Sequence, residues 1–367
     1  MKRRDFDQLK HWLKTSLTLA LVLALSLGLG AAAKRPSSLP AGNPITDGKA
    51  LLRYALPINN PPVRELQKSL EDISQQLRAV KRWGAIAGDI SKAKRVLEKP
   101  ETLLASVPEA KQGAATTLIE QIKTGLSDLE QAVEAKDKEH IYQIRNQLLD
   151  WVGQLEETMV VDFPFEVPAE YRNLPQLRGH ATIEFKTDKG NMTAVVDGYS
   201  APITAGNFVD LVQRGFYDGL AFTRAEDNYV LQIGDPPGPE VGFVDPKTKQ
   251  YRAIPLEVLV EGDKEPTYGI TMEDAGRYKE LPVLPFSAFG AMAMARPGDD
   301  PNGGSSQFFF FLFEPELTPA GLNLLDGRYS VFGYVTEGKD VLEKLKAGDK
   351  IQSARVVKGL ENLVQPG

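Results

Sequence analysis

The chain has 367 residues, 42% hydrophobic and 25% charged, with a formal net charge of -6 at pH 7. This length exceeds the usual size of one hydrophobic core, so we expect two domains. The acidic balance argues against a general nucleic-acid binder, which needs a concentrated basic face. The chain has no cysteine, which excludes disulfide bonds, thiolate metal sites and cysteine nucleophiles.

Residues 1–33 follow the three-part plan of a secretory signal peptide. Basic residues between Lys2 and Lys14 precede an apolar run, and three alanines then supply small residues for cleavage. An uncleaved membrane anchor is the alternative, because the run with its alanines approaches the roughly 20 residues that span a bilayer. In both cases the sequence predicts an exported protein, either soluble or tethered once to a membrane.

Residues 34–61 are rich in proline, glycine, serine and asparagine, and we predict a linker there. A short apolar patch at 51–56 favours one or two helical turns within it. From Pro62 the apolar residues recur every three or four positions, which indicates an amphipathic helix. The pattern also allows this helix to continue through 85–97 as far as Pro100.

Two further periodic runs, 118–133 and 141–155, predict two more helices. Each apolar stripe needs a partner, so we predict an antiparallel bundle of three or four helices over 62–160. Three prolines then favour an extended linker at 161–176.

The remainder, 177–367, is rich in short strands. Segments 181–186 and 191–196 flank a turn and predict a hairpin. Helical spacing follows from residue 205 until Gly215, a residue typical of helix ends, and another helix is expected near 338–346. Many short strands with few helices favour a closed barrel.

Two segments of this second domain carry the strongest functional signal. In the first, Phe222-Thr223-Arg224 precedes Gln232-Ile233-Gly234-Asp235, and the alternation predicts a strand in which Gln232 shares a face with Val230. The second is Ser306-Gln307-Phe308-Phe309. The two segments resemble the signature segments of the cyclophilins, the peptidyl-prolyl cis-trans isomerases. The resemblance includes their order along the chain and the compatible spacing of Met294-Ala295 and Leu325-Asp326-Gly327.

The resemblance covers roughly 177–357 and implies an eight-stranded antiparallel β-barrel capped by helices. The whole architecture is an α+β multidomain chain with a signal peptide, a helical bundle and this barrel. It is similar to the multidomain cyclophilins of the thylakoid lumen, in a cyanobacterial version. That family is associated with the assembly and maintenance of photosystem II.

The resemblance also implies a site. Isomerising a peptide bond means losing amide resonance, the source of a barrier of about 18–20 kcal/mol. Arg224 would donate toward the proline amide nitrogen, and Gln232 would hold the substrate backbone or Arg224 itself. The residues expected to bind substrate are Phe222, Tyr229, Val230, Ala295, Arg296, Phe309, Leu324, Leu325 and Tyr329. The reaction requires no metal and no cofactor.

Several positions depart from the family pattern. Thr223 stands where a histidine is usual, Arg296 replaces an asparagine, Leu324 a tryptophan and Tyr329 a histidine. The lost tryptophan predicts weak cyclosporin binding. Because Arg224, Gln232 and Phe309 are kept, we predict slow but genuine isomerase activity. The segment 236–290 is longer than in single-domain members and is expected to form a lid or an interaction loop.

Two functions stay open at this point. The first is an exported prolyl isomerase of the lumen or periplasm, acting on proline-containing clients that include photosystem II subunits. The second is a weak or inactive chaperone or scaffold that binds proline-containing loops. In a third arrangement, an intramolecular contact between the helical domain and the barrel regulates access to the pocket. Nucleic acid is not an expected partner.

Overall fold

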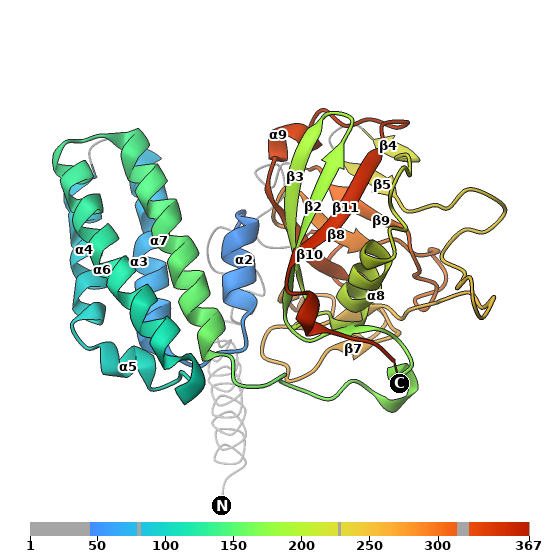
Figure 1. The fold of residues 1–367 in the computed structure, drawn as a ribbon, viewed down its shortest axis with the longest axis horizontal. Helices are drawn as coiled ribbons and strands as arrows, with labels where there is room; N and C mark the ends of the chain where they lie inside the picture. Colours follow the sequence, from blue (N-terminus) through green and yellow to red (C-terminus); the bar gives the residue numbers. More distant parts are fainter. Residues whose placement is uncertain (1–44, 79–81, 227–228, 314–322, 367) are drawn as a thin grey trace, which may run out of the picture. The chain divides into compact units, whose positions relative to one another are not determined.

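The computed structural model describes residues 45–78, 82–226, 229–313 and 323–366 (Figure 1). The predicted signal peptide, and with it the choice between cleavage and anchoring, lies outside these residues. Within the described ranges, every helix is too short or too polar to cross a bilayer. Pro44–Gly367 form one unit, which contains the helical bundle and the β-sheet domain.

The bundle contains four long helices, as predicted: α3 (Pro61–Arg78), α4 (Trp83–Leu97), α6 (Gln112–Glu134) and α7 (Lys138–Met159), with the short α5 (Pro100–Leu104) between α4 and α6. The pattern also allowed one continuous helix over 62–97. That alternative is wrong, because α3 and α4 are separate helices whose apolar faces share one core.

Local signals explain where these helices begin. The Asn60 side chain accepts a hydrogen bond from the backbone N–H of Val63 at 2.9 Å, and its amide group donates to the carbonyl of Thr102 at 3.0 Å. One N-cap residue thus begins α3 and joins it to α5. Asp137 caps α7 in the same way by accepting from the N–H of His140.

A further helix, α2 (Gly48–Ala55), lies inside the segment predicted as a linker. Its buried face of Leu51, Leu52 and Ala55 belongs to an apolar cluster of the sheet domain. Gly48 lies against the ring of Tyr334, where an added Cβ would come within 2.6 Å of the Tyr334 Cβ. This part of the expected linker is therefore a packed element, because its apolar patch covers the outer face of a strand.

The second domain is an eight-stranded antiparallel sheet in the order β11-β2-β3-β10-β8-β9-β5-β4. Its strands are β2 (His180–Thr187), β3 (Gly190–Asp197), β4 (Arg224–Glu226), β5 (Val230–Ile233), β8 (Ala291–Met294), β9 (Phe308–Phe311), β10 (Val331–Glu337) and β11 (Ile351–Lys358). Two small sheets pair β1 (Gln176–Leu177) with β12 (Leu363–Val364) and β6 (Glu257–Val258) with β7 (Thr267–Tyr268).

The sheet curls until its two ends approach each other. Ala221, just before β4, forms a bridge with Lys350, just before β11. The N–H of Phe222 donates to the carbonyl of Asp349 at 2.9 Å. The predicted eight-stranded antiparallel fold is confirmed, and its closure consists of this short bridge between the end strands.

An aromatic core fills the sheet's concave side. Along β9, Phe308 and Phe310 point into this interior, while Phe309 and Phe311 join the apolar cluster on the opposite face. Helix α8 (Pro202–Gln213) covers the interior, and its Phe208 contacts Phe308 and Phe332 with ring centroids 5.0 and 5.1 Å apart. The predicted helix near 338–346 is the four-residue α9 (Lys339–Leu342).

The segment 236–290 runs mostly as loops, and a buried carboxylate anchors its middle. Glu257 accepts hydrogen bonds from the N–H groups of Ile203 and Thr204 at 3.2 and 2.9 Å, at the start of α8. Burial raises the pKa of Glu257 to about 7, against the lowering effect of the Thr204 and Ile203 donors. The carboxylate therefore ties this segment to the first turn of α8.

Candidate active site

The two sequence motifs meet on neighbouring strands. In the pairing of β4 with β5, Arg224 lies opposite Gln232. In the pairing of β5 with β9, Gln232 lies opposite Phe309, and Phe309 in turn lies opposite Ala293 of β8. Directly opposite residues share a face of the sheet, so a cation, an amide and an aromatic ring form one cross-strand row.

Arg224 is the exposed end of this row, with 55% of its side chain accessible to solvent. Its Nε donates to Oε1 of Glu226 at 2.8 Å, and its Nη2 contacts the same oxygen. Residues two apart on a strand share a face, which places this acid beside the guanidinium. A substrate that needs these donors must compete with Glu226.

Gln232 is fixed by a residue that the sequence prediction left out of the site. Its Nε2 donates to Oε1 of Gln307 at 2.7 Å. Gln307 in turn donates to the Asp235 carboxylate at 3.1 Å and to the carbonyl of Val241 at 2.8 Å. Gln307 belongs to the Ser306-Gln307-Phe308-Phe309 motif, so the signal for it was present in the sequence.

An aromatic cluster forms the apolar end of the row. Phe309 is only 5% exposed. The ring of Phe286 stacks on it with centroids 5.9 Å apart, and Tyr329 meets it edge-on at 5.3 Å. Val230 is buried in the same cluster, and Leu325 packs against it. Phe286 comes from the long segment 236–290 and was not among the predicted residues.

Three predicted residues lie around this cluster. Tyr229 is partly exposed and contacts Phe311 edge-on at 5.9 Å. Arg296 lies over the ring of Tyr329, with its guanidinium carbon 5.2 Å from the centroid, and its Nε donates to the carbonyl of Arg328. Ala295 is half-buried and packs against the same apolar cluster. The structure thus places a second cation near Phe309.

Two predicted substrate-binding residues lie elsewhere. Phe222 is buried in the sheet's interior beside Phe310, on the face opposite Phe309, so we correct the expectation that it lines the pocket. Leu324 is 87% exposed and lies outside the apolar cluster that contains Phe309. A solvated side chain of this kind supplies no wall to a pocket.

The row offers donors beside a dry aromatic surface. Such an arrangement suits a reaction in which charge redistributes on a neutral substrate without a covalent intermediate. The row itself consists of the Arg224 guanidinium, the Gln232 amide and the Phe309 ring, and none of these three groups is a nucleophile at neutral pH.

Family comparisons match both halves of the chain. Residues 47–160 match a family described as the peptidyl-prolyl cis-trans isomerase CYP38-like, PsbQ-like domain. Residues 182–361 match the cyclophilin type peptidyl-prolyl cis-trans isomerase family. A Synechocystis protein named as a thylakoid lumen peptidyl-prolyl cis-trans isomerase is 61% identical over 89% of this chain and 86% of its own length.

One more relative and one solved structure were also found. The chloroplastic peptidyl-prolyl cis-trans isomerase CYP38 of Arabidopsis thaliana is 47% identical over 90% of this chain and 78% of that protein. A solved cyclophilin type isomerase of Cryptosporidium parvum is 20% identical with a TM-score of 0.36, covering 48% of this chain and 99% of that one.

Proposed function

The chain belongs to the cyclophilin-type peptidyl-prolyl cis-trans isomerases, and we propose that Arg224, Gln232 and Phe309 form its catalytic pocket. The observation that carries this proposal is the register that aligns these three residues across β4, β5 and β9. The register places the polar donors and the apolar surface on one face, at neighbouring positions.

In this pocket the proline ring of the substrate packs on Phe309, between Phe286 and Tyr329. Arg224 donates toward the proline amide nitrogen, whose lone pair becomes available as amide resonance is lost in the twisted state. Gln232, held by Gln307, orients the substrate backbone. The equilibrium between the isomers is nearly balanced, so the pocket has only to lower the barrier.

The test of this proposal compares wild type with Arg224→Ala in a protease-coupled assay on a proline-containing peptide. Removing one fixed donor is expected to lower kcat/KM by about 100-fold. Lys186→Ala, at an exposed position on β2, is the matched control and should leave the rate unchanged. Equal rates for wild type and Arg224→Ala would overturn the catalytic assignment.

We also propose that the protein acts in the thylakoid lumen, and that its clients include photosystem II subunits with exposed proline-containing loops. The lumenal location is supported by the name of the Synechocystis relative. Calorimetric titration with peptides from lumenal loops of photosystem II tests the client class. Binding is expected to depend on the proline, and peptides that bind equally well with alanine in its place would contradict it.

A non-catalytic scaffold is the second candidate function, and the contact between Arg224 and Glu226 favours it. If Arg224 stays paired with Glu226 while a proline-containing loop is bound, its donors do not reach the proline amide nitrogen, and the loop is bound without being isomerised. In that case Phe309→Ala weakens peptide binding while Arg224→Ala changes neither binding nor the already low rate. The pair of variants therefore separates the two functions.

A further inference from the structure

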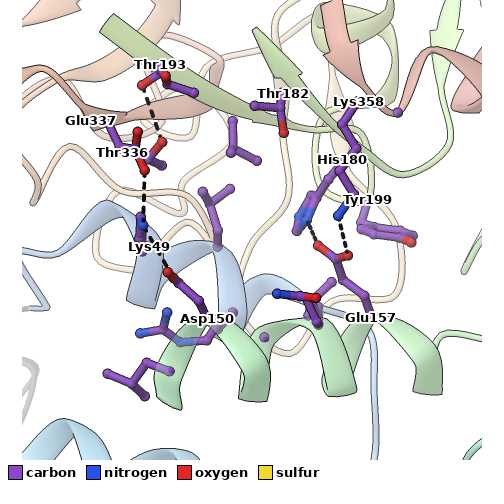
Figure 2. A pocket seen from close by; sticks show the side chains of 18 of the residues that line it. Lys49, Asp150, Glu157, His180, Thr182, Thr193, Tyr199, Thr336, Glu337 and Lys358 are labelled. Atoms are coloured by element: carbon purple, nitrogen blue, oxygen red, sulfur yellow. Dashed lines mark hydrogen bonds and ion pairs between the residues drawn. The ribbon is translucent and has the colours of Figure 1, made fainter. Parts of the chain in front are cut away.

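A group of charged side chains joins the end of α7 to the sheet, and we call it the clasp. It consists of Glu157 from α7, His180 at the start of β2 and Lys358 at the end of β11, which Figure 2 shows, together with Asp197 at the end of β3. His180 Nδ1 lies 3.2 Å from Glu157 Oε1, and Lys358 Nζ lies 3.4 Å from Glu157 Oε2. His180 Nε2 lies 3.6 Å from Asp197 Oδ1.

Both acids of the clasp are held in fixed positions. Asp197 lies opposite His180 in the β2–β3 register and is completely buried. Its two oxygens accept from the N–H of Tyr199 at 2.7 Å and from the hydroxyl of Ser200 at 2.9 Å. Glu157 lies in the last turn of α7, and this last turn contains no basic residue. The negative end of the helix dipole disfavours an acid there, so Glu157 depends on cations from the sheet.

The geometry around His180 fits the charged imidazole better than the neutral one. Each ring nitrogen faces a carboxylate oxygen, and a neutral imidazole has only one N–H donor. In the neutral form, therefore, one nitrogen lone pair faces an acid. In the protonated form both nitrogens donate, and two cations, His180 and Lys358, balance the two acids. Nε2 is buried and has no hydrogen-bond partner, because its 3.6 Å distance to Asp197 is longer than the 3.2 Å distance from Nδ1 to Glu157.

The clasp is an important polar link because the apolar cores do not continue from α7 into the sheet. The buried apolar residues of α7 belong to the bundle core, which is separate from the three apolar clusters of the sheet domain. Beside the clasp lies a cleft of about 480 Å³. At its far end, Lys49 of α2 contacts Asp150 of α7 at 3.3 Å and Glu337 of β10 at 3.8 Å (Figure 2).

We propose that the clasp is a proton-operated switch: protonated His180 holds the end of α7 on the sheet, and loss of the proton releases it. Release leaves α2 in place, which packs on the sheet through its apolar face and contacts the bundle through the Lys49–Asp150 and Arg53–Glu71 ion pairs. It also opens the cleft, whose sheet side carries Thr182, Thr193 and Thr336. This inference concerns how the two domains are held together and does not depend on the catalytic assignment.

The groups around His180 set the direction of the pH response. Burial lowers its pKa, but the hydrogen bond to Glu157 and the charges of Glu157 and Asp197 outweigh burial and Lys358, so the pKa is raised. Tyr199 also meets the ring edge-on at 5.4 Å. A raised pKa means that the contact is fully formed below the ordinary histidine value of about 6.5 and is lost as the pH rises through the higher, folded value.

The first experiment is a histidine NMR titration of the described chain. Only His140 and His180 occur after residue 11, and His140 is exposed on α7 outside the clasp. His180→Gln assigns the resonances. The His180 midpoint is expected above the ordinary histidine value of about 6.5, and Glu157→Gln should bring it down by removing one acid. A His180 midpoint below that ordinary value would overturn the proposal.

The second experiment measures the separation between the bundle and the sheet. Because the chain lacks cysteine, Gln131→Cys on α6 and Glu184→Cys on β2, both exposed, accept two spin labels without background. One narrow distance is expected at about pH 5, and a longer, broader distribution at about pH 8, above the ordinary histidine pKa. His140→Gln should keep this response, and His180→Gln should abolish it. A pH-independent distribution in the wild type would refute the switch.

Discussion

The helical bundle and the β-sheet domain bury their charged groups in different ways. In the bundle, two buried acids face opposite charges: Glu156 meets Arg64 at 3.0 Å, and Asp89 meets Lys92 at 2.7 Å. In the sheet domain, several buried acids are instead satisfied by N–H and hydroxyl donors. Glu257 at α8 and Asp197 are two examples, and the half-buried Asp326, which accepts from the N–H of Phe286 at 2.8 Å, follows the same pattern.

This difference follows from the backbone. Helices use their own N–H groups internally, so an acid on a helix face must find a side-chain partner. Loops and helix starts leave N–H groups free, and an acid there satisfies the backbone while it anchors a segment. Burial raises the pKa of Glu156 to about 8 and that of Asp326 to about 6. The first shift is countered by Arg64 and the second by backbone donors.

The largest expected effect comes from removing the cation that pairs with buried Glu156 in the bundle. Arg64→Met leaves Glu156 buried without its cation, and also removes donors to the carbonyls of Arg53 and Leu56. We expect a loss of about 3 kcal/mol in the free energy of unfolding, measured by urea denaturation. Adding Glu156→Leu should recover part of it, because the buried carboxyl group that has lost its partner is gone. A double variant less stable than Arg64→Met would contradict this account.

A smaller effect is expected from the buried acid of the sheet domain. Glu257→Gln keeps the size of the side chain but replaces one acceptor oxygen by a donor facing N–H groups, which should cost about 2 kcal/mol. With a pKa raised to about 7, Glu257 binds a proton more tightly when folded, so its contribution is complete below the unfolded value of 4.5 and is lost as the pH rises through about 7.

Urea denaturation below pH 4.5 and above about pH 7 therefore tests whether Glu257 titrates as its raised pKa predicts. The wild type should lose stability as the pH rises, and Glu257→Gln should lose less. Glu240→Gln, exposed in the same segment, is the matched control and should behave as the wild type. Identical pH slopes for all three proteins would show that Glu257 does not titrate in this range.

The smallest effect concerns the exposed pair at the proposed pocket. Glu226→Gln removes the carboxylate that competes for the Arg224 donors. Exposed pairs are worth about 0.2–1 kcal/mol, so kcat/KM should rise by no more than about fivefold. Added salt should raise the wild-type rate and have less effect on the variant. A fall in rate, with Glu184→Gln on β2 unchanged, would instead assign Glu226 a role in binding substrate.

The elements that could be predicted from sequence are those with local signals. The apolar stripes of the bundle helices, the first hairpin and the order of the family motifs all lie in contiguous residues. Phe222 was misplaced because the family resemblance assigned it to the pocket together with its neighbour Arg224. The strand begins only at Arg224, whereas Phe222 lies before it, where its N–H donates to the carbonyl of Asp349 and its ring packs in the sheet's interior. Phe286 and the clasp depend on contacts between distant segments, which no local pattern encodes.

The packing of α2 against Tyr334 has a consequence for the order of folding. An eight-residue helix is not stable alone in water, because nucleation costs more than so few hydrogen bonds return. Its partner strand, β10, follows the whole bundle and most strands of the sheet, so α2 has no partner until those segments have been made. The bundle is able to condense early from local contacts, whereas α2, the helix that precedes it in the chain, docks late.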